Sequence, residues 1–207
     1  NIIRMRPDHP AAYFFSAMAT WYEITYDSLL NRNPQLDKEF EEMIDKTIAV
    51  SKKFSKDKRT EAAGNLYWGG GLGAKGWRLI TRRQWVKSYL SGKKGFSLLK
   101  NAIELDPELY DAYLGVGMYE YYAATLGPVL KVLSTFLVRG DRQEALRYLH
   151  SAESKSRYVR LEAAYFLWNA YMDEGRLAEA EEKSAFLNRT IPQSPLFEWC
   201  EIQLLFY

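Results

Sequence analysis

The feature that most constrains the fold is a helix-pair pattern that recurs along the chain. Its clearest copy is residues 161–195, LEAAYFLWNAYMDEGRLAEAEEKSAFLNRTIPQSP. Helical spacing places Ala164, Leu167, Trp168 and Tyr171 on one face of a first helix. Gly175 is predicted to turn the chain into a second helix, which ends near Pro192. Ala180, Ser184 and Leu187 share one face of that second helix.

Partial copies of the same pattern occur elsewhere in the chain. Residues 93–122, KKGFSLLKNAIELDPELYDAYLGVGMYEYY, read as a second helix, a proline stop and the start of another first helix. Residues 140–152, GDRQEALRYLHSA, repeat the second-helix spacing, and residues 2–22 contain the end of one unit and the start of the next. Because no stretch alternates with a period of two, the chain is predicted to be helical almost throughout.

These units resemble the tetratricopeptide (TPR) repeat. The resemblance rests on the large and small residues at these spacings, the helix-ending proline and the IELDP ending at 103–107. It departs at Trp168, where the family usually has a small residue. It implies antiparallel helix pairs that stack into an α-solenoid with a concave face.

The distance between the two packing positions of each pair predicts unusual repeats. Ala180 follows Trp168 by 12 residues, but the other pairs are 26, 26 and 28 residues apart. Those pairs are Ala17/Met43, Gly69/Gly95 and Gly117/Ala145. We therefore expect an all-α, TPR-like α-solenoid of antiparallel helix pairs, with about four repeats and elongated helices. One domain, 1–207, would hold repeats at roughly 8–58, 60–107, 109–157 and 159–195, and the chain would begin inside an earlier repeat.

The third insertion contains an apolar segment, LGPVLKVLSTFLV (126–138). It fits a buried bracing helix better than a helix that lies on a membrane or a partner. Together with the GDR-type helix start that follows it, this segment resembles a stretch of the inclusion-body clearance family of TPR proteins. That resemblance covers 126–152 and implies long helical repeats without catalytic residues.

A glycine-rich stretch, YWGGGLGAKGWR (67–78), contains G-x-G-x-x-G at Gly71–Gly76. A dinucleotide loop needs a preceding strand and an acidic residue about 20 positions further on. The residues before Gly71 have helical composition, and the next acidic residue is Glu104. We therefore expect no nucleotide and no other cofactor here.

We predict instead that these glycines let neighbouring helices approach closely. Large rings such as Trp21 and Tyr121 are expected to pack on them, so Gly73→Leu would destabilise the fold by kilocalories. The residues predicted to have structural packing roles are Ala17, Gly69, Gly73, Gly76, Gly117, Ala145 and Ala180.

Residues suited to catalysis or metal binding do not form a recognisable set. His9 and His150 are the only histidines and Cys200 the only cysteine, so no triad, disulfide or cysteine-based zinc site is predicted. Adjacent carboxylates occur in solvated helix or turn patterns and give no sign of the pKa separation that acid–base catalysis needs. The sequence predicts no catalytic residue, no metal site and a protein that is not an enzyme.

Charge also narrows the range of partners. A net charge of +2 argues against a dedicated nucleic-acid binder. Two basic clusters are expected to be solvated helix faces, although contact with an anionic membrane surface or an acidic partner stays open. The first cluster is Lys52, Lys53, Lys56, Lys58 and Arg59, and the second is Arg78, Arg82, Arg83 and Lys87.

The TPR resemblance implies binding through the inner face of the first helices, and that face is aromatic here. Its residues are Phe14, Met18, Trp21, Tyr22, Tyr67, Trp77, Met118, Tyr121, Tyr122, Tyr165 and Asn169. This chemistry suits a peptide or helical protein partner better than a C-terminal carboxylate. The leading hypothesis is a protein-interaction scaffold, and the alternative is a binding protein for a small apolar or lipid-like ligand, at a membrane surface or away from one. The compartment stays open, cytoplasmic or exported, because the chain starts without Met.

Overall fold

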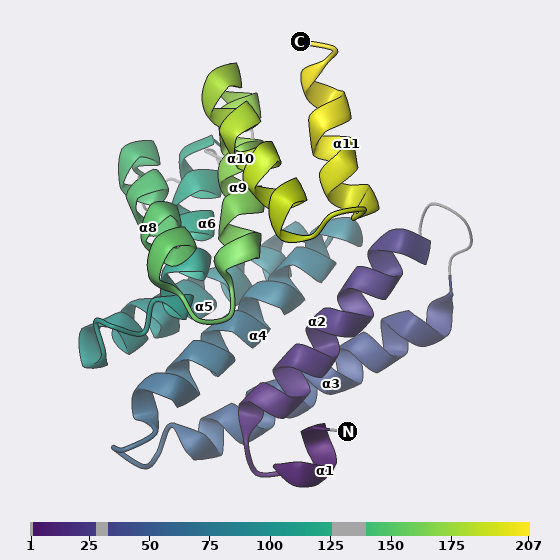
Figure 1. The fold of residues 1–207 in the computed structure, drawn as a ribbon. Helices are drawn as coiled ribbons and strands as arrows, with labels where there is room; N and C mark the ends of the chain where they lie inside the picture. Colours follow the sequence, from purple (N-terminus) through teal and green to yellow (C-terminus); the bar gives the residue numbers. More distant parts are fainter. Residues whose placement is uncertain (1, 28–32, 126–139) are drawn as a thin grey trace. The chain divides into compact units, whose positions relative to one another are not determined.

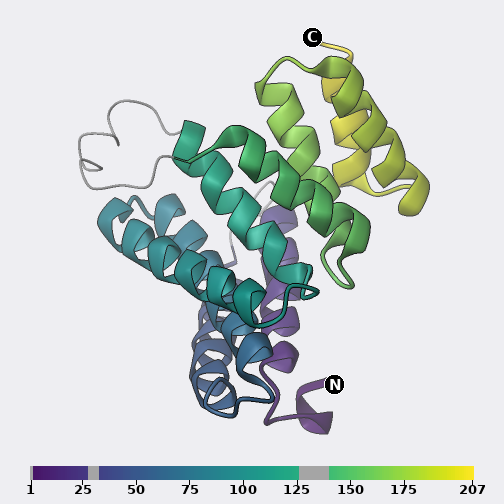
Figure 2. The same ribbon diagram turned by 90° about the vertical axis from the view of Figure 1, so that its left-hand side faces the viewer.

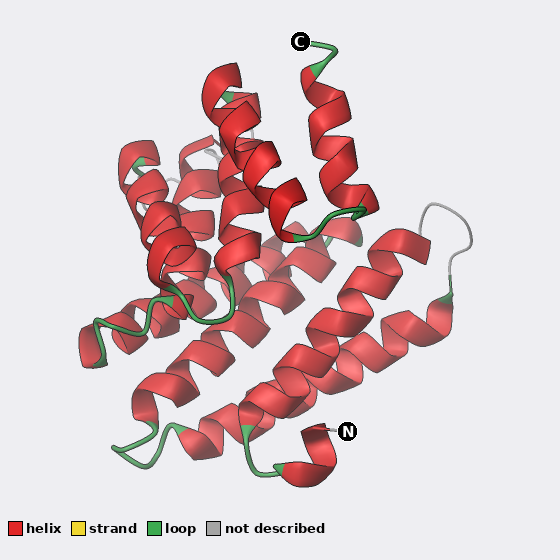
Figure 3. Ribbon diagram, in the orientation of Figure 1, coloured by secondary structure: helices red, strands yellow, loops and turns green. Residues whose placement is uncertain are grey.

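The computed structural model describes residues 2–27, 33–125 and 140–207. Within these ranges every regular element is a helix, and no strand occurs (Figure 3). The helices form two compact units, Asn1–Gly115 and Val116–Tyr207, which are described in turn. The all-α prediction is confirmed.

The first unit is built from long consecutive helices joined by short turns. It holds α1 (Ile2–Met5), α2 (Pro10–Asp27), α3 (Pro34–Phe54), α4 (Glu61–Thr81), α5 (Trp85–Leu105) and the start of α6 (Asp111–Thr125). Neighbours in sequence pack against each other, and Figure 1 and Figure 2 both show α4 and α5 side by side. Helices α2 to α5 are 18 to 21 residues long, as expected for elongated repeats.

Local sequence explains how α3 begins and which face it buries. The backbone N–H of Gln35 donates to Asn33 Oδ1 over 3.0 Å, which satisfies a donor that the first turn leaves unpaired. Phe40, Ile44 and Ile48 then recur every four residues on one buried face. That stripe forms the core of the unit together with the buried Ala17 of α2.

The glycine-rich stretch lies inside α4, with no strand before it. It therefore lacks the strand–turn–helix geometry of a pyrophosphate loop. Gly69 lies where α4 meets α5, since an added Cβ would be 2.7 Å from Leu99 Cγ and 2.8 Å from the Gly95 carbonyl oxygen. Gly76 is also buried, and its added Cβ would be 3.3 Å from the Ser88 carbonyl oxygen.

The prediction for Gly73 is wrong. Gly73 is exposed, and an added Cβ would have no atom within 4 Å. The ring nearest to an α4 glycine is Phe14, 3.1 Å from the Cβ position of Gly70, whereas Trp21 packs on Phe40. Spacing along the helix placed Gly73 beside Gly69, but its missing side chain points away from the neighbouring helices.

The second unit has shorter helices. After the end of α6 it holds α8 (Arg142–Lys155), α9 (Arg160–Asp173), α10 (Leu177–Thr190) and α11 (Pro195–Leu204). Helices α8 to α10 are 14 residues long. Asp141 Oδ1 accepts hydrogen bonds from the N–H groups of Gln143 and Glu144, so it caps α8. Gly175, at φ 69°, turns the chain between α9 and α10.

Small residues mark the closest approaches in this unit as well. A Cβ on Gly117 would lie 2.8 Å from Leu149 Cγ and 3.0 Å from the Ala145 carbonyl oxygen. Ala145 and Ala180 are fully buried. Trp168, the departure from the TPR pattern, is also buried, with 3% of its surface exposed.

Among the described residues, the predicted repeat ranges contain the helix pairs α2/α3, α4/α5, α6/α8 and α9/α10. That all four belong to one domain, 1–207, stays a prediction. Helix α11 was not predicted, although Ser194 followed by Pro195 is a typical helix start. The apolar segment 126–138 lies outside the described residues, so both its predicted burial and the resemblance over 126–152 stay predictions.

Candidate protein-interaction site

In the first unit, most of the predicted aromatic face packs between helices. The rings of Phe14 and Tyr67 are 5.8 Å apart, edge to face, and Tyr67 is only 8% exposed. Met18 and Trp21 pack against the buried core of α2 and α3. These side chains stabilise the contacts between α2, α3 and α4. Tyr67 is buried by them, whereas Phe14, Met18 and Trp21 stay half-buried.

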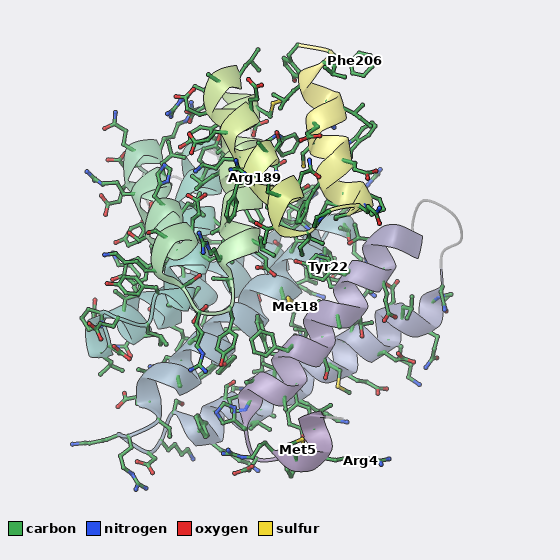
Figure 4. The ribbon with its side chains drawn as sticks, viewed as in Figure 1. Arg4, Met5, Met18, Tyr22, Arg189 and Phe206 are labelled. Atoms are coloured by element: carbon green, nitrogen blue, oxygen red, sulfur yellow. The ribbon has the colours of Figure 1, made fainter. Side chains whose placement is uncertain are left out.

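Two predicted residues of this unit keep exposed surface. Tyr22 is 42% exposed and Trp77 is 39% exposed. Tyr22 projects from the same side of α2 as Met18, one turn further along the helix (Figure 4). Of the residues predicted for the aromatic face, the first unit therefore exposes two rings, and these lie on different helices.

In the second unit, the predicted residues of α6 and α9 form a connected set of rings. Tyr122 meets Tyr121 at 6.1 Å and Phe166 at 6.4 Å, both edge to face. Phe166 meets Tyr165 at 6.1 Å, and Tyr165 stacks on Trp168 at 5.8 Å. Tyr121 and Trp168 are buried, whereas Tyr122, Phe166 and Tyr165 are half-buried. We call these last three residues the α6/α9 aromatic row.

Polar contacts support the two helices that carry this row. The Tyr121 hydroxyl donates to the Ala170 carbonyl oxygen over 3.2 Å and so ties α6 to α9. Asn169 Nδ2 donates to the Tyr165 carbonyl oxygen over 2.9 Å within α9. Met118 and Asn169 are half-buried like the row itself. The structure thus keeps all five predicted residues of this unit on two packed helices, four of them partly accessible.

Burial and nearby carboxylates set the electrostatics of the row. Burial, followed by the negative charges of Glu174 and Asp173, raises the pKa of Tyr121 to about 12. Burial and then the Asp173 charge raise the pKa of Tyr122 to about 12 as well. The row is therefore an uncharged aromatic surface with acidic residues beside it. Such a surface disfavours a partner carboxylate and suits an apolar segment with hydrogen-bond donors or cations.

Sequence reasoning missed Phe166, which joins Tyr122 to Tyr165. Its only sequence signal is its place beside Tyr165 in a helix that is apolar on several faces.

The second basic cluster also differs from its expectation, because Arg78 is not solvated. Its side chain is 9% exposed and forms an ion pair with Asp37 of α3. Arg82 pairs in the same way with Glu41.

The histidines have structural contacts. The backbone N–H of Ala11 donates to His9 Nδ1 over 3.2 Å, and the His9 ring packs edge to face on Phe54 at 4.9 Å. His150 Nε2 lies 2.7 Å from the Tyr171 hydroxyl. Among the residues described, no group of three or more His, Cys, Asp or Glu side chains could hold a metal ion.

In the part of the chain that the structure covers, no helix is long and apolar enough to cross a membrane.

Comparison with known proteins gives a match at the level of the fold. The crystal structure of a thermophilic TPR protein from Thermus thermophilus matches with a TM-score of 0.57 and 16% sequence identity. The match covers 95% of this chain and 92% of that chain. No family model and no curated protein matches the sequence. At such low identity the likeness shows the fold alone: the chain has a TPR-like fold of antiparallel helix pairs.

Proposed function

We propose that this protein is a non-enzymatic protein-interaction scaffold and that the α6/α9 aromatic row binds a peptide or helical segment of its partner. The observation that carries the proposal is the row itself: three rings in contact across two helices, each still partly accessible. Rings that the fold already holds in place lose little conformational entropy on binding. Tyrosine and other aromatic residues therefore often dominate the energetics of protein interfaces.

The chemistry of the row supports an apolar partner segment. Tyr122, Tyr165 and Phe166 offer apolar faces, and the two tyrosine hydroxyls add hydrogen-bonding groups. Asp173 is exposed at the end of α9 and would attract a lysine or arginine beside the apolar contact. The partner would therefore combine apolar anchors with at least one basic side chain.

The test is quantitative enrichment of partners from an extract of the source organism. Wild-type protein is compared with the double variant Tyr122→Ala/Phe166→Ala. The matched control is Tyr158→Ala, which removes an exposed ring before α9 that is not part of the row. Loss of two anchor rings should weaken binding of a true partner by at least about thirtyfold, while Tyr158→Ala should leave it unchanged.

A native mass spectrum of the freshly purified protein separates the alternative function. A small apolar or lipid-like molecule that co-purifies with the wild type, but not with the double variant, would favour a ligand-binding protein over a scaffold. A partner retained equally by the wild type and the double variant would show that the row is not the interaction site. Circular dichroism of each variant confirms that the helices are intact.

A further inference from the structure

A second recognition surface lies in the first unit, away from the predicted aromatic residues. A groove of about 650 Å³ runs between α3 and α5, with α4 as its floor. Leu72 and Leu79 of α4 contribute apolar floor, and Ala49 of α3 lies exposed on one wall. On the opposite wall, the Ser91 hydroxyl of α5 donates to the Leu72 carbonyl oxygen over 2.8 Å and ties the wall to the floor.

The residues along the groove form three stripes at helical spacing, one on each of α3, α4 and α5. Trp68 lies one turn before Leu72 on α4 and continues the same stripe just beyond the residues that line the groove. On α3, Ala49 and Lys52 are three residues apart and face the groove together. On α5, Lys87, Ser91 and Lys94 recur at intervals of four and three residues. The stripe from Trp68 to Leu79 is about 16 Å long at 1.5 Å per residue.

Lysines from both walls give the groove a positive charge. Lys52 and Lys94 lie over the Trp68 ring, with Nζ at 5.4 and 5.0 Å from its centroid. Lys87 lines the other end of the groove, and Lys75 on the floor is paired with Asp45 at 2.7 Å. No described carboxylate forms an ion pair with Lys52, Lys87 or Lys94. Lys52, Lys87 and Lys94 therefore outnumber the one carboxylate in the lining, Asp45, which is paired with Lys75.

We propose that this groove binds an acidic peptide segment of a partner protein, with apolar side chains on Leu72 and Leu79. Carboxylates on either side of those apolar residues would meet Lys52 and Lys94 at one end and Lys87 at the other. The positive charge of the lysines favours an acidic partner, and the recessed floor between two helices suits a peptide segment. A lipid surface is broad and nearly flat, whereas this floor lies between two helices. About 11 helical residues or five extended residues span the stripe from Trp68 to Leu79.

This site is distinct from the α6/α9 aromatic row. Its walls are the second helices of two helix pairs, whereas the row lies on first helices. Its residues all belong to the first unit, and those of the row belong to the second. Lysines line the groove, whereas acidic residues lie beside the row. The two sites can therefore be disabled separately, and one can fail while the other holds.

The experiment uses an array of fluorescent 15-residue peptides in which Leu, Ile or Phe alternate in all registers with Glu or Asp. Binding to the full chain is measured by fluorescence anisotropy. One groove variant is Lys52→Glu/Lys87→Glu/Lys94→Glu. A second, Ala49→Tyr, narrows the groove without changing its charge. The matched control is Lys53→Glu/Lys56→Glu/Lys58→Glu, which makes the same charge change in exposed residues that do not line the groove.

We expect the best peptides to lose affinity by at least about tenfold in both groove variants and by less than about twofold in the control. Twin peptides with Lys in place of each acid should not bind. Three outcomes would overturn the proposal: no peptide binds, the control weakens binding as much as the groove variant, or Ala49→Tyr has no effect. Phosphatidylserine vesicles are tested in parallel. Vesicle binding that depends on Lys52, Lys87 and Lys94, together with failure of the peptides, would assign the surface to a membrane instead.

Discussion

The two units use different residues where the two helices of a pair come closest. In the first unit, α4 and α5 meet glycine to glycine: a Cβ on Gly69 would be 2.8 Å from the Gly95 carbonyl oxygen, and a Cβ on Gly95 would be 2.8 Å from that of Gly69. In the second unit, Gly117 meets Ala145 with the corresponding distance at 3.0 Å. The last pair places Trp168 and Ala180 at the equivalent positions, and both are buried.

This difference shows what the packing position of a helix pair requires. It does not require a particular small residue on the first helix, since Trp168 occupies it in one pair. It requires a volume that the facing helix can accommodate. The pair with two glycines joins helices of 21 residues through near-contact of their backbones. In the last pair of the second unit, the buried side chains of Trp168 and Ala180 fill this contact instead.

The largest expected effect comes from filling the glycine contact. Gly69→Leu should lower the free energy of unfolding by about 3 kcal/mol, because its side chain would meet backbone that cannot move aside alone. Gly117→Leu should also destabilise the protein, but less, because its added Cβ would be slightly further from its neighbours: 2.8 Å from Leu149 Cγ and 3.0 Å from the Ala145 carbonyl oxygen, against 2.7 Å from Leu99 Cγ and 2.8 Å from the Gly95 carbonyl oxygen at Gly69. Urea unfolding of both variants tests the order. Equal losses would mean that the two units tolerate overpacking alike, and no loss in either would contradict the close approach.

The sequence predicts those features of the structure that depend on nearby residues and misses those that depend on neighbouring helices. The helix-pair spacing is a local pattern, and it singles out Gly69 and Gly117, whose added Cβ atoms would each meet the facing helix. The same pattern could not tell an accessible ring from a buried one, so Tyr67 and Tyr121 were assigned to a binding face although both are buried. Which side of an amphipathic helix is covered depends on the neighbouring helices.

For the same reason, local sequence patterns could not predict the lysine-lined groove. Lys52 and Lys87 appeared in two separate basic clusters, and only the packing of α3 and α5 around α4 brings them to one groove. Arg78 shows the converse. Its place in a basic run suggested a solvated side chain, whereas the neighbouring α3 supplies Asp37 and buries the pair.

An intermediate effect is expected at an ion pair of the second unit. Lys183 of α10 lies 2.9 Å from Glu153 of α8, and both side chains are largely buried. Burial alone would raise the pKa of Glu153, but hydrogen bonds from His150 and Lys183 outweigh it and hold the pKa below the ordinary 4.5. Glu153→Gln should therefore cost about 2 kcal/mol at neutral pH, because it leaves the largely buried Lys183 with only the exposed Glu182, 3.6 Å away, as a counter-charge.

The same pair predicts a dependence on pH. A carboxyl group whose folded pKa is depressed contributes stability above its unfolded pKa, and that stability is lost as the pH falls through the folded value. Wild-type protein should therefore lose this contribution below about pH 4.5, and the Glu153→Gln variant should show a shallower loss over the same range. Thermal unfolding between pH 3 and 7 measures both curves. Parallel curves would show that the pair contributes nothing to the acid response.

The smallest expected effect, and the sharpest test of the comparison, is a gain in stability at Gly73. An alanine Cβ at this exposed helical position would touch nothing, so only backbone entropy and helix propensity change. Gly73→Ala should raise the free energy of unfolding by about 0.5–1 kcal/mol. Gly69→Ala, four residues earlier on the same helix, makes the identical chemical change and should lower it. If both substitutions lowered stability, Gly73 would also lie at a close contact, and the boundary of the glycine contact along α4 would have to be redrawn.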